Sequence, residues 1–217
     1  MRAVLRLPSV YLGFQALVGG TKMRSLCLAL LEPKPGQRIV DIGCGPAYYL
    51  AELPAVDYCG FDTDARYIEH ARRRFGSRGR FYVEPFTQVH ADALGPFDGV
   101  LLMGLLHHLS DSECAALLSL LSQCLRPGGR VVTLDTVLHE RQGTVERWLA
   151  LNDRGKYVRS PSGFEALAKL HFADVRGTLA SSPRVPSIYY AMVLQHRMSP
   201  GQLGAAREVP RHPEEDA

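Results

Sequence analysis

The chain has 217 residues, 46% of them hydrophobic, which is enough for one large domain with a buried core. Its formal net charge of +3 is too small to indicate, by itself, a protein that binds nucleic acid. Five cysteines are scattered without C-x-x-C spacing, which disfavours a disulfide scaffold or a zinc site and predicts a cytoplasmic protein. No uninterrupted apolar run approaches the ~18 residues of a membrane span, so we expect no integral membrane segment.

Residues 1–35 predict a helical cap at the start of the domain. Residues 1–20 carry two arginines and an apolar part, which loosely resembles a signal peptide. However, Pro8 and Gly13 interrupt the apolar part, and no A-x-A cleavage site follows. We therefore expect an amphipathic helix that covers the sheet or a ligand pocket, with Tyr11 as a candidate for facing that pocket.

From residue 38 onward, predicted strands alternate with predicted helices. The strands are expected over residues 38–42, 57–61, 80–86, 97–103 and 130–135. Helices are expected over about 48–53 and 64–75, and a third follows the S-x-x-E capping box that begins at Ser110. Residues 87–96 are expected to be a polar connection. Repeated strand–helix units predict an α/β fold with a parallel sheet and right-handed crossovers.

The pattern loosens over residues 137–160, and two pieces of undecided type follow at about 161–170 and 173–180. A last apolar strand is expected over 187–195. From residue 199 the chain is rich in proline, glycine and charge without periodicity, which predicts a disordered tail. These features indicate a single domain over 1–198.

The loop that follows the first predicted strand carries the strongest functional signal. The strand leads through Asp41 into Gly43 and Gly45, which places a turn without side chains at the carboxyl end of a strand. Open α/β sheets bind their ligands at that edge. A carboxylate at this position would repel phosphate, so a cationic or hydroxyl-bearing ligand fits better.

A second acid, Asp62, ends the second predicted strand, where a carboxylate can accept both hydroxyls of an adenosine ribose. Nicotinamide-dependent oxidoreductases and adenosylmethionine-dependent methyltransferases both use this arrangement. The dehydrogenase fingerprint G-x-G-x-x-G/A would need a small residue where this chain has Tyr48. No Tyr-x-x-x-Lys pair is recognisable either, so an NAD(P)-dependent oxidoreductase is the less favoured alternative.

At this point the chain resembles the class I adenosylmethionine-dependent methyltransferases, and its overall pattern is similar to their small-molecule branch. The matching segments, which together cover about residues 38–136, are 40–45, 60–64, 97–103 with His107 and His108, and 125–130. The resemblance implies a doubly wound, Rossmann-like, mostly parallel seven-stranded sheet with an antiparallel last strand. A non-catalytic methyltransferase-like binding protein is the other alternative.

The resemblance also implies a site for S-adenosyl-L-methionine. Asp41 and Gly43 are expected beside the methionine moiety, and Asp62 is expected to hold the ribose. An acid often contacts the adenine in this family, and here Glu84, Phe86 and Asp92 all stay candidates for that place. The other residues expected to line the cofactor site are Cys44, Gly45, Thr63, Phe86, Met103 and Gly104.

Methyl transfer from a sulfonium needs mainly alignment, but an oxygen acceptor can need a base. His107 and His108 are the candidates for that base, and the alternative is that they only begin a helix.

Residues 137–160 follow the carboxyl end of the fifth predicted strand and are the best candidate for an acceptor-binding insertion. Its mild excess of basic residues predicts a small-molecule acceptor with an acidic group, bound by Arg154 and Arg159. Trp148 and Tyr157 are predicted to add an aromatic surface. The alternative is a surface helix with ordinary ion pairs.

Overall fold

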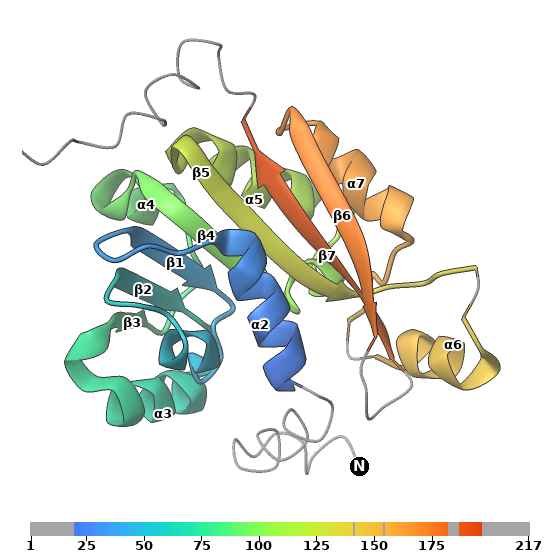
Figure 1. Cartoon of the computed structure of the whole chain (residues 1–217), viewed down its shortest axis with the longest axis horizontal. Helices are drawn as coiled ribbons and strands as arrows, with labels where there is room; N and C mark the ends of the chain where they lie inside the picture. Colours follow the sequence, from blue (N-terminus) through green and yellow to red (C-terminus); the bar gives the residue numbers. More distant parts are fainter. Residues whose placement is uncertain (1–19, 141, 154, 182–186, 197–217) are drawn as a thin grey trace, which may run out of the picture.

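The computed structural model describes residues 20–140, 142–153, 155–181 and 187–196. Its centre is a seven-stranded sheet with the strand order β3-β2-β1-β4-β5-β7-β6 (Figure 1). Strands β1 to β5 run parallel, and β7 pairs antiparallel with both β5 and β6. The predicted fold class, including the antiparallel last strand, is therefore confirmed. The strands are β1 Arg38–Ile42, β2 Asp57–Phe61, β3 Arg80–Tyr82, β4 Phe97–Met103, β5 Leu125–Thr136, β6 Asp174–Ser181 and β7 Ile188–Gln195.

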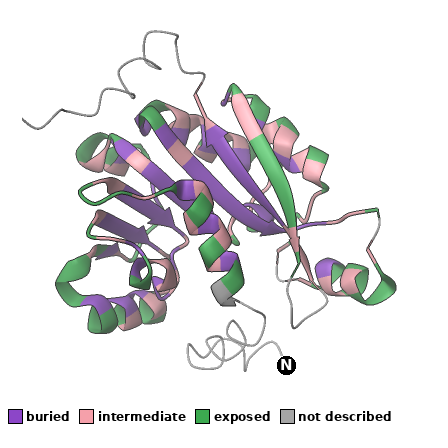
Figure 2. Cartoon of the chain, in the orientation of Figure 1, coloured by how far each residue is buried: buried purple, intermediate pink, exposed green. Residues whose placement is uncertain are grey.

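Helices cover both faces of the sheet and give two apolar layers. On one face, α2 and α3 pack on side chains such as Ile39 and Leu101. On the other face, α4, α5 and α7 pack on side chains such as Val40 and Val100. Because adjacent strand residues point to opposite faces and helices cover both faces, the central strands are buried along most of their length, as their purple colour in Figure 2 shows. The helices are α2 Gly20–Leu31, α3 Ala65–Phe75, α4 Gln88–Leu94, α5 Asp111–Cys124, α6 Thr144–Leu151 and α7 Pro161–Lys169, with 3-10 turns η2 Tyr48–Ala51, η3 Gly76–Arg78 and η4 Leu106–His108.

Helix α2 lies against the middle of the sheet because one strand residue there lacks a side chain. A Cβ at Gly99 of β4 would lie 2.7 Å from Ile39 Cδ1 and 2.9 Å from Leu31 Cδ1. The end of α2 therefore fits closely on β1 and β4. In addition, Arg130 of β5 donates a hydrogen bond to the carbonyl of Leu30 and forms an ion pair with Glu32.

Several element predictions differ from the structure: β5 begins at Leu125, before the predicted start at residue 130, and the predicted helix 48–53 is the short 3-10 turn η2. The predicted strand 80–86 ends at Tyr82, before Pro85, which has no N–H to give a ladder. The predicted polar connection 87–96 contains α4, whose first turn is capped reciprocally by Thr87 and His90 instead of by S-x-x-E. Residues 144–151, left without assignment, form α6. The capping box predicted at Ser110 is present at the start of α5.

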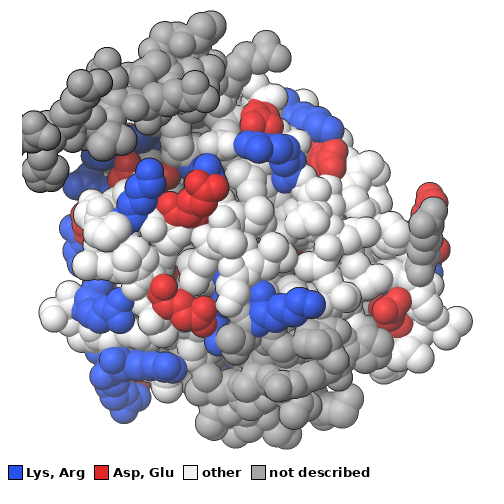
Figure 3. Space-filling model, in the orientation of Figure 1, with Lys and Arg blue, Asp and Glu red and all other residues white. Residues whose placement is uncertain are grey.

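All five cysteines are buried and free, in both apolar layers. Burial raises the pKa of the Cys27 thiol to about 12 and that of the Cys114 thiol to about 11. Over the described ranges, no cluster of metal-ligating side chains occurs, and none of the helices there is long and apolar enough to cross a membrane. Positive and negative side chains are interspersed on the face that Figure 3 shows.

Candidate functional site

The loop after β1 keeps its backbone free of side chains. Gly43 and Gly45 have φ angles of 73° and 53°, a left-handed region that favours glycine. The N–H groups of Gly43 and Cys44 both donate to the carbonyl of Phe61, at 2.8 Å and 2.9 Å. A Cβ on Gly43 would lie 3.3 Å from Leu105 Cδ1, so this loop also touches the loop after β4.

Asp62 connects the ends of β1 and β2. Its Oδ2 accepts the N–H of Gly45 at 2.9 Å, and its Oδ1 accepts the N–H of Asp64 at 2.8 Å. Burial raises its pKa, although both backbone hydrogen bonds oppose this change. Two carboxylate oxygens have about four lone-pair sites between them, so further acceptor capacity remains for hydroxyl groups of a ligand.

Asp41 lies buried beneath the same loop. Tyr58 donates its hydroxyl to Asp41 Oδ2 at 2.8 Å, whereas Oδ1 finds no hydrogen-bond partner among the described residues. Burial raises the pKa of Asp41 to about 7, against the hydrogen bond from Tyr58. A buried oxygen without a partner costs free energy, and a cationic or donor group bound nearby would remove part of that cost.

The loop after β4 completes this edge of the sheet. Gly104 has a φ of 69° and donates its N–H to the carbonyl of Leu134 at 2.7 Å. Met103 is half-buried just before it. Together with the contact between Gly43 and Leu105, this places the loops after β1, β2 and β4 along one edge.

The other residues predicted for the cofactor site lie close to the same loops. Thr63 is exposed next to Asp62. Phe86 is buried edge-to-face on Phe61, with ring centroids 5.2 Å apart. Cys44 is buried, and burial raises its pKa well above the ordinary value, so its thiol stays protonated.

His107 lies between two carboxylates. Its Nδ1 is 2.8 Å from Asp135 Oδ1, at the end of β5, and its Nε2 is 3.2 Å from Asp153 Oδ1, beyond α6. Burial alone would lower the pKa of His107, but the two carboxylates outweigh it and raise the pKa to about 9. A pKa of about 9 favours the imidazolium form of the ring near neutral pH. His108 beside it is exposed.

The side chain of Arg159 is bound to the backbone of η4 and to the start of α5. Its guanidinium donates to the carbonyls of Leu106 and Leu109, at 3.0 Å and 2.7 Å, and pairs with Asp111 at 2.6 Å. This side chain is only 11% exposed. The structure thus places Arg159 in a structural contact rather than in open space.

Of the four remaining candidates for binding the acceptor, two are exposed and two lie outside the described residues. Trp148 on α6 and Tyr157 are 59% and 42% exposed, and Val145 and Leu151 add exposed apolar surface on α6. Tyr11 and Arg154 lie outside the described residues. Figure 1 shows α6 beyond the carboxyl end of β5, and the exposed apolar side chains of this helix are Val145, Trp148 and Leu151.

Two residues of this region were not predicted as site residues. Asp135 ends an apolar strand, as Asp41 and Asp62 do, so the same pattern of an acid after a buried strand was available. Asp153 gives no such signal, because its contact with His107 exists only after the chain between them has folded.

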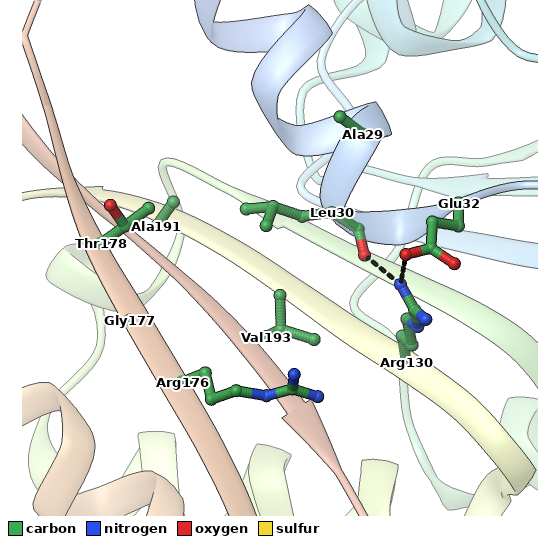
Figure 4. Close-up of a pocket in the computed structure, with 9 residues that line it drawn as sticks. All are labelled: Ala29, Leu30, Glu32, Arg130, Arg176, Gly177, Thr178, Ala191 and Val193. Atoms are coloured by element: carbon green, nitrogen blue, oxygen red, sulfur yellow. Dashed lines mark hydrogen bonds and ion pairs between the residues drawn. The ribbon is translucent and has the colours of Figure 1, made fainter.

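A cavity of about 210 Å³ lies elsewhere, between the end of α2 and strands β6 and β7. Figure 4 shows Arg130 on its wall, bound to the Leu30 carbonyl and to Glu32. Arg176 on the opposite wall pairs with Asp174. This cavity borders Arg130 in the first half of β5. The loops of the candidate site instead follow the carboxyl ends of β1, β2 and β4.

Comparison with known proteins agrees with the geometry of these loops. Residues 39–129 match the family model described as a methyltransferase domain. Over these residues the chain is similar to methyltransferase domains. The matched range includes His107 and the site residues Asp41, Gly43, Gly45, Asp62 and Gly104.

Individual relatives point the same way. The O-methyltransferase cnsE of Penicillium expansum is 33% identical over 119 residues, which are 49% of this chain and 41% of that protein. The chain spans less than half the length of the first curated relatives it matches.

Solved structures share the fold. An O-methyltransferase family protein from Burkholderia thailandensis superposes with a TM-score of 0.63 at 16% identity, over 88% of this chain and 59% of that one. Human N-acetylserotonin methyltransferase, solved in complex with SAM, gives 0.58 at 19% identity, over 89% and 58%.

Proposed function

We propose that this chain transfers the methyl group of S-adenosyl-L-methionine to an oxygen of a small-molecule acceptor. The observation that carries the proposal is the meeting of three left-handed glycines, Gly43, Gly45 and Gly104, with Asp62 at one edge of the sheet. The names of curated relatives, several of them O-methyltransferases, support oxygen as the acceptor atom.

The charges at this edge favour adenosylmethionine over a nicotinamide dinucleotide. An acid at the Asp62 position suits the ribose of either cofactor, but Asp41 lies beneath the glycine loop, where it would meet the pyrophosphate of NAD with like charge. Adenosylmethionine instead carries a cationic amino group and a sulfonium, and its ribose offers two hydroxyl donors.

Each loop has a role in this proposal. Asp62 accepts the ribose hydroxyls, and Thr63 lies beside it. The backbone of Gly43, Cys44 and Gly45 lets the ligand approach closely, with Asp41 beneath it to favour the amino group. The other contacts that we propose are Phe86 near the adenine, and Met103 and Gly104 beside the methionine moiety.

The bound cofactor would supply an activated methyl group, so this chain needs mainly to align the acceptor and exclude water. We keep the general-base hypothesis for His108, since both nitrogens of His107 already face carboxylates. Replacing His108 by alanine should lower the turnover number without weakening the binding of adenosylhomocysteine.

The acceptor is proposed to lie against residues 137–160. Exposed Trp148 and Tyr157 favour an acceptor with an apolar or aromatic body. Because Arg159 is already paired, an acidic group on the acceptor would have to meet another cation of this segment, such as Lys156, which is exposed.

Titration calorimetry with adenosylmethionine, adenosylhomocysteine and NAD tests the cofactor part of this proposal. We expect the first two to bind and NAD not to bind. Assays of adenosylhomocysteine release, with a panel of phenols, carboxylic acids and neutral alcohols, then test methyl transfer. Binding without turnover of any acceptor would instead favour a non-catalytic binding protein.

A further inference from the structure

His107 joins three parts of the chain that are far apart in the sequence. Its Nδ1 forms a hydrogen bond with Asp135 on β5, and its Nε2 lies at ion-pair distance, 3.2 Å, from Asp153 beyond α6. Asp153 also accepts the hydroxyl of Thr136 at 3.1 Å and the N–H of Gly155 at 2.9 Å. We call Asp135, His107 and Asp153 the clasp.

Backbone contacts bring the same segment down onto η4. Tyr157 donates its N–H to the carbonyl of His107 at 3.0 Å. Gly155 approaches the ring so closely that a Cβ there would lie 2.0 Å from His107 Cδ2. Arg159 then holds the carbonyls of Leu106 and Leu109. Gly155, Tyr157 and Arg159 therefore lie directly on the turn that follows the Gly104 loop.

The charges of the clasp depend on one proton. An imidazole can donate from both nitrogens only when it is protonated, and each carboxylate here receives one of those donors. Ionisable groups around this turn include His108, whose ring centroid lies 4.3 Å from that of His107, and Tyr157, whose N–H binds the His107 carbonyl. Arg159 and Cys114 both contact the carbonyl of Leu106. Asp135 Oδ2 has no hydrogen-bond partner among the described residues, so loss of the His107 proton would leave buried carboxylate charge uncompensated.

We propose that His107 is a positioning residue, whose imidazolium fastens residues 153–159 over η4 and so fixes the acceptor side of the site. This inference rests on the proposed function, which makes the neighbouring insertion the acceptor side. Among the described residues, no hydrogen bond or ion pair joins Asp135, His107 or Asp153 to Asp62 or to the Gly43 loop. Its loss should therefore release the acceptor segment and leave the cofactor loops in place.

Hydrogen exchange of the full chain tests this proposal with three variants. Asp153→Ala removes the carboxylate, Asp153→Asn keeps an acceptor oxygen without its charge, and Glu140→Gln is an exposed control in the same insertion. We expect Asp153→Ala to lower the protection of residues 152–160 about tenfold and Asp153→Asn to lower it less. Glu140→Gln should change nothing, and all variants should bind adenosylhomocysteine within about twofold of wild type.

Nitrogen-15 spectra of histidine supply a readout that a packing role alone would not move. We expect His107 to stay doubly protonated at about pH 8 in the wild type, where an ordinary histidine is neutral. In Asp153→Asn its titration midpoint should fall by about one unit, a tenfold change in proton affinity. If Asp153→Ala fails to fold, the hydrogen exchange and the His107 titration of Asp153→Asn alone test the proposal.

A neutral His107 in the wild type at that pH, or unchanged protection of 152–160 in a folded Asp153 variant, would overturn the proposal. Failure of the wild type to bind adenosylhomocysteine would instead refute the proposed function, because the exchange and spectral results on the clasp do not need that ligand.

Discussion

The two sides of the carboxyl edge use their carboxylates differently. On the β1–β2 side, Asp41 has an oxygen without a partner and Asp62 accepts only backbone N–H groups. On the β5 side, Asp135 and Asp153 share a cation that belongs to the chain itself, His107. The first side therefore has charge left for a ligand, whereas the second side uses its charge to hold the chain together.

The largest effect is expected from placing a side chain in the loop after β1, which tests whether the β1–β2 side binds the ligand. Gly43→Val should abolish binding of adenosylhomocysteine, at least 100-fold in the dissociation constant, because a side chain would enter the ligand space at a left-handed φ of 73°. Circular dichroism and calorimetry measure folding and binding together.

Gly36→Val is the matched control for this change. Gly36 has a φ of 80° and nothing within 4 Å of an added Cβ, in a turn outside the site. It should suffer the same backbone strain, about 1–2 kcal/mol, and keep its affinity for the ligand. Equal binding by both valine variants would show that the Gly43 loop is not a ligand site.

Removing Asp62 should have the next largest effect. Asp62→Ala should cost roughly 1.5–3 kcal/mol of binding free energy, because charge-assisted hydrogen bonds to the ribose would be lost. Calorimetry with adenosylhomocysteine measures it. Asp57→Ala is the control, since Asp57 lies at the other end of β2 in surface ion pairs with Arg38 and Arg80. A normal affinity for Asp62→Ala would refute this assignment.

Replacing Asp41 should change the stability of the fold and the affinity for the ligand in opposite directions. Its pKa of about 7 lies above the ordinary 3.8, so the folded state loses stability as the pH rises from 3.8 through 7. We expect Asp41→Asn to raise the free energy of unfolding at about pH 8 by roughly 1–3 kcal/mol and to weaken binding of adenosylhomocysteine about tenfold. Urea titration and calorimetry measure the two effects. An Asn variant that is less stable than wild type at that pH would contradict the argument.

The clasp predicts the opposite dependence on pH. The pKa of His107 is raised from 6.5 to about 9, so its stabilisation is complete below pH 6.5 and is lost as the pH rises through about 9. The pKa of Asp153 is lowered from 3.8 to about 2, so its contribution is present above 3.8 and lost as the pH falls through about 2. Both contributions are complete between about pH 3.8 and pH 6.5, so the clasp stabilises the fold most in that range.

Urea unfolding of His107→Gln against wild type checks this window. The difference in unfolding free energy should be larger at about pH 6 than at about pH 9.5. A constant difference for His107→Gln would mean that its charge does not stabilise the fold.

The smallest expected effect concerns the apolar surface of the insertion. Because Trp148 is 59% exposed, Trp148→Ala should change the free energy of unfolding by only about 0.5 kcal/mol or less. Leu170→Ala, 69% exposed at the end of α7, is the control. A loss well above that value would show that Trp148 belongs to the core, and it would remove the side chain from the acceptor hypothesis.

The two regions also differ in how far their structure could be predicted from the sequence. Strands β1 and β2 have the predicted bounds, because strands buried on both faces are continuous apolar runs that end at turn residues. The left-handed glycines follow from the same local pattern. Helix α4 was missed because only Ala91 of its residues is buried, so the helix shows no apolar stripe.

The clasp could not be predicted in this way. His107 stood out only as a possible base, and Asp153 and Arg159 looked like solvated charges of an insertion. Their partners are a buried carboxylate on another strand and the carbonyls of a short turn, which only the tertiary structure brings together. Long-range polar contacts of this kind leave no periodic signal in the chain.

The buried cysteines give the molecule an internal reporter of its own opening. A thiol must both reach solvent and ionise before it reacts with an alkylating reagent, and burial opposes both steps. Cys27 on α2 and Cys44 belong to the apolar layer between the sheet and helices α2 and α3, whereas Cys114 and Cys124, both on α5, belong to the layer on the opposite face. The order in which native cysteines become alkylated would therefore record which face of the sheet separates first, without any engineered label.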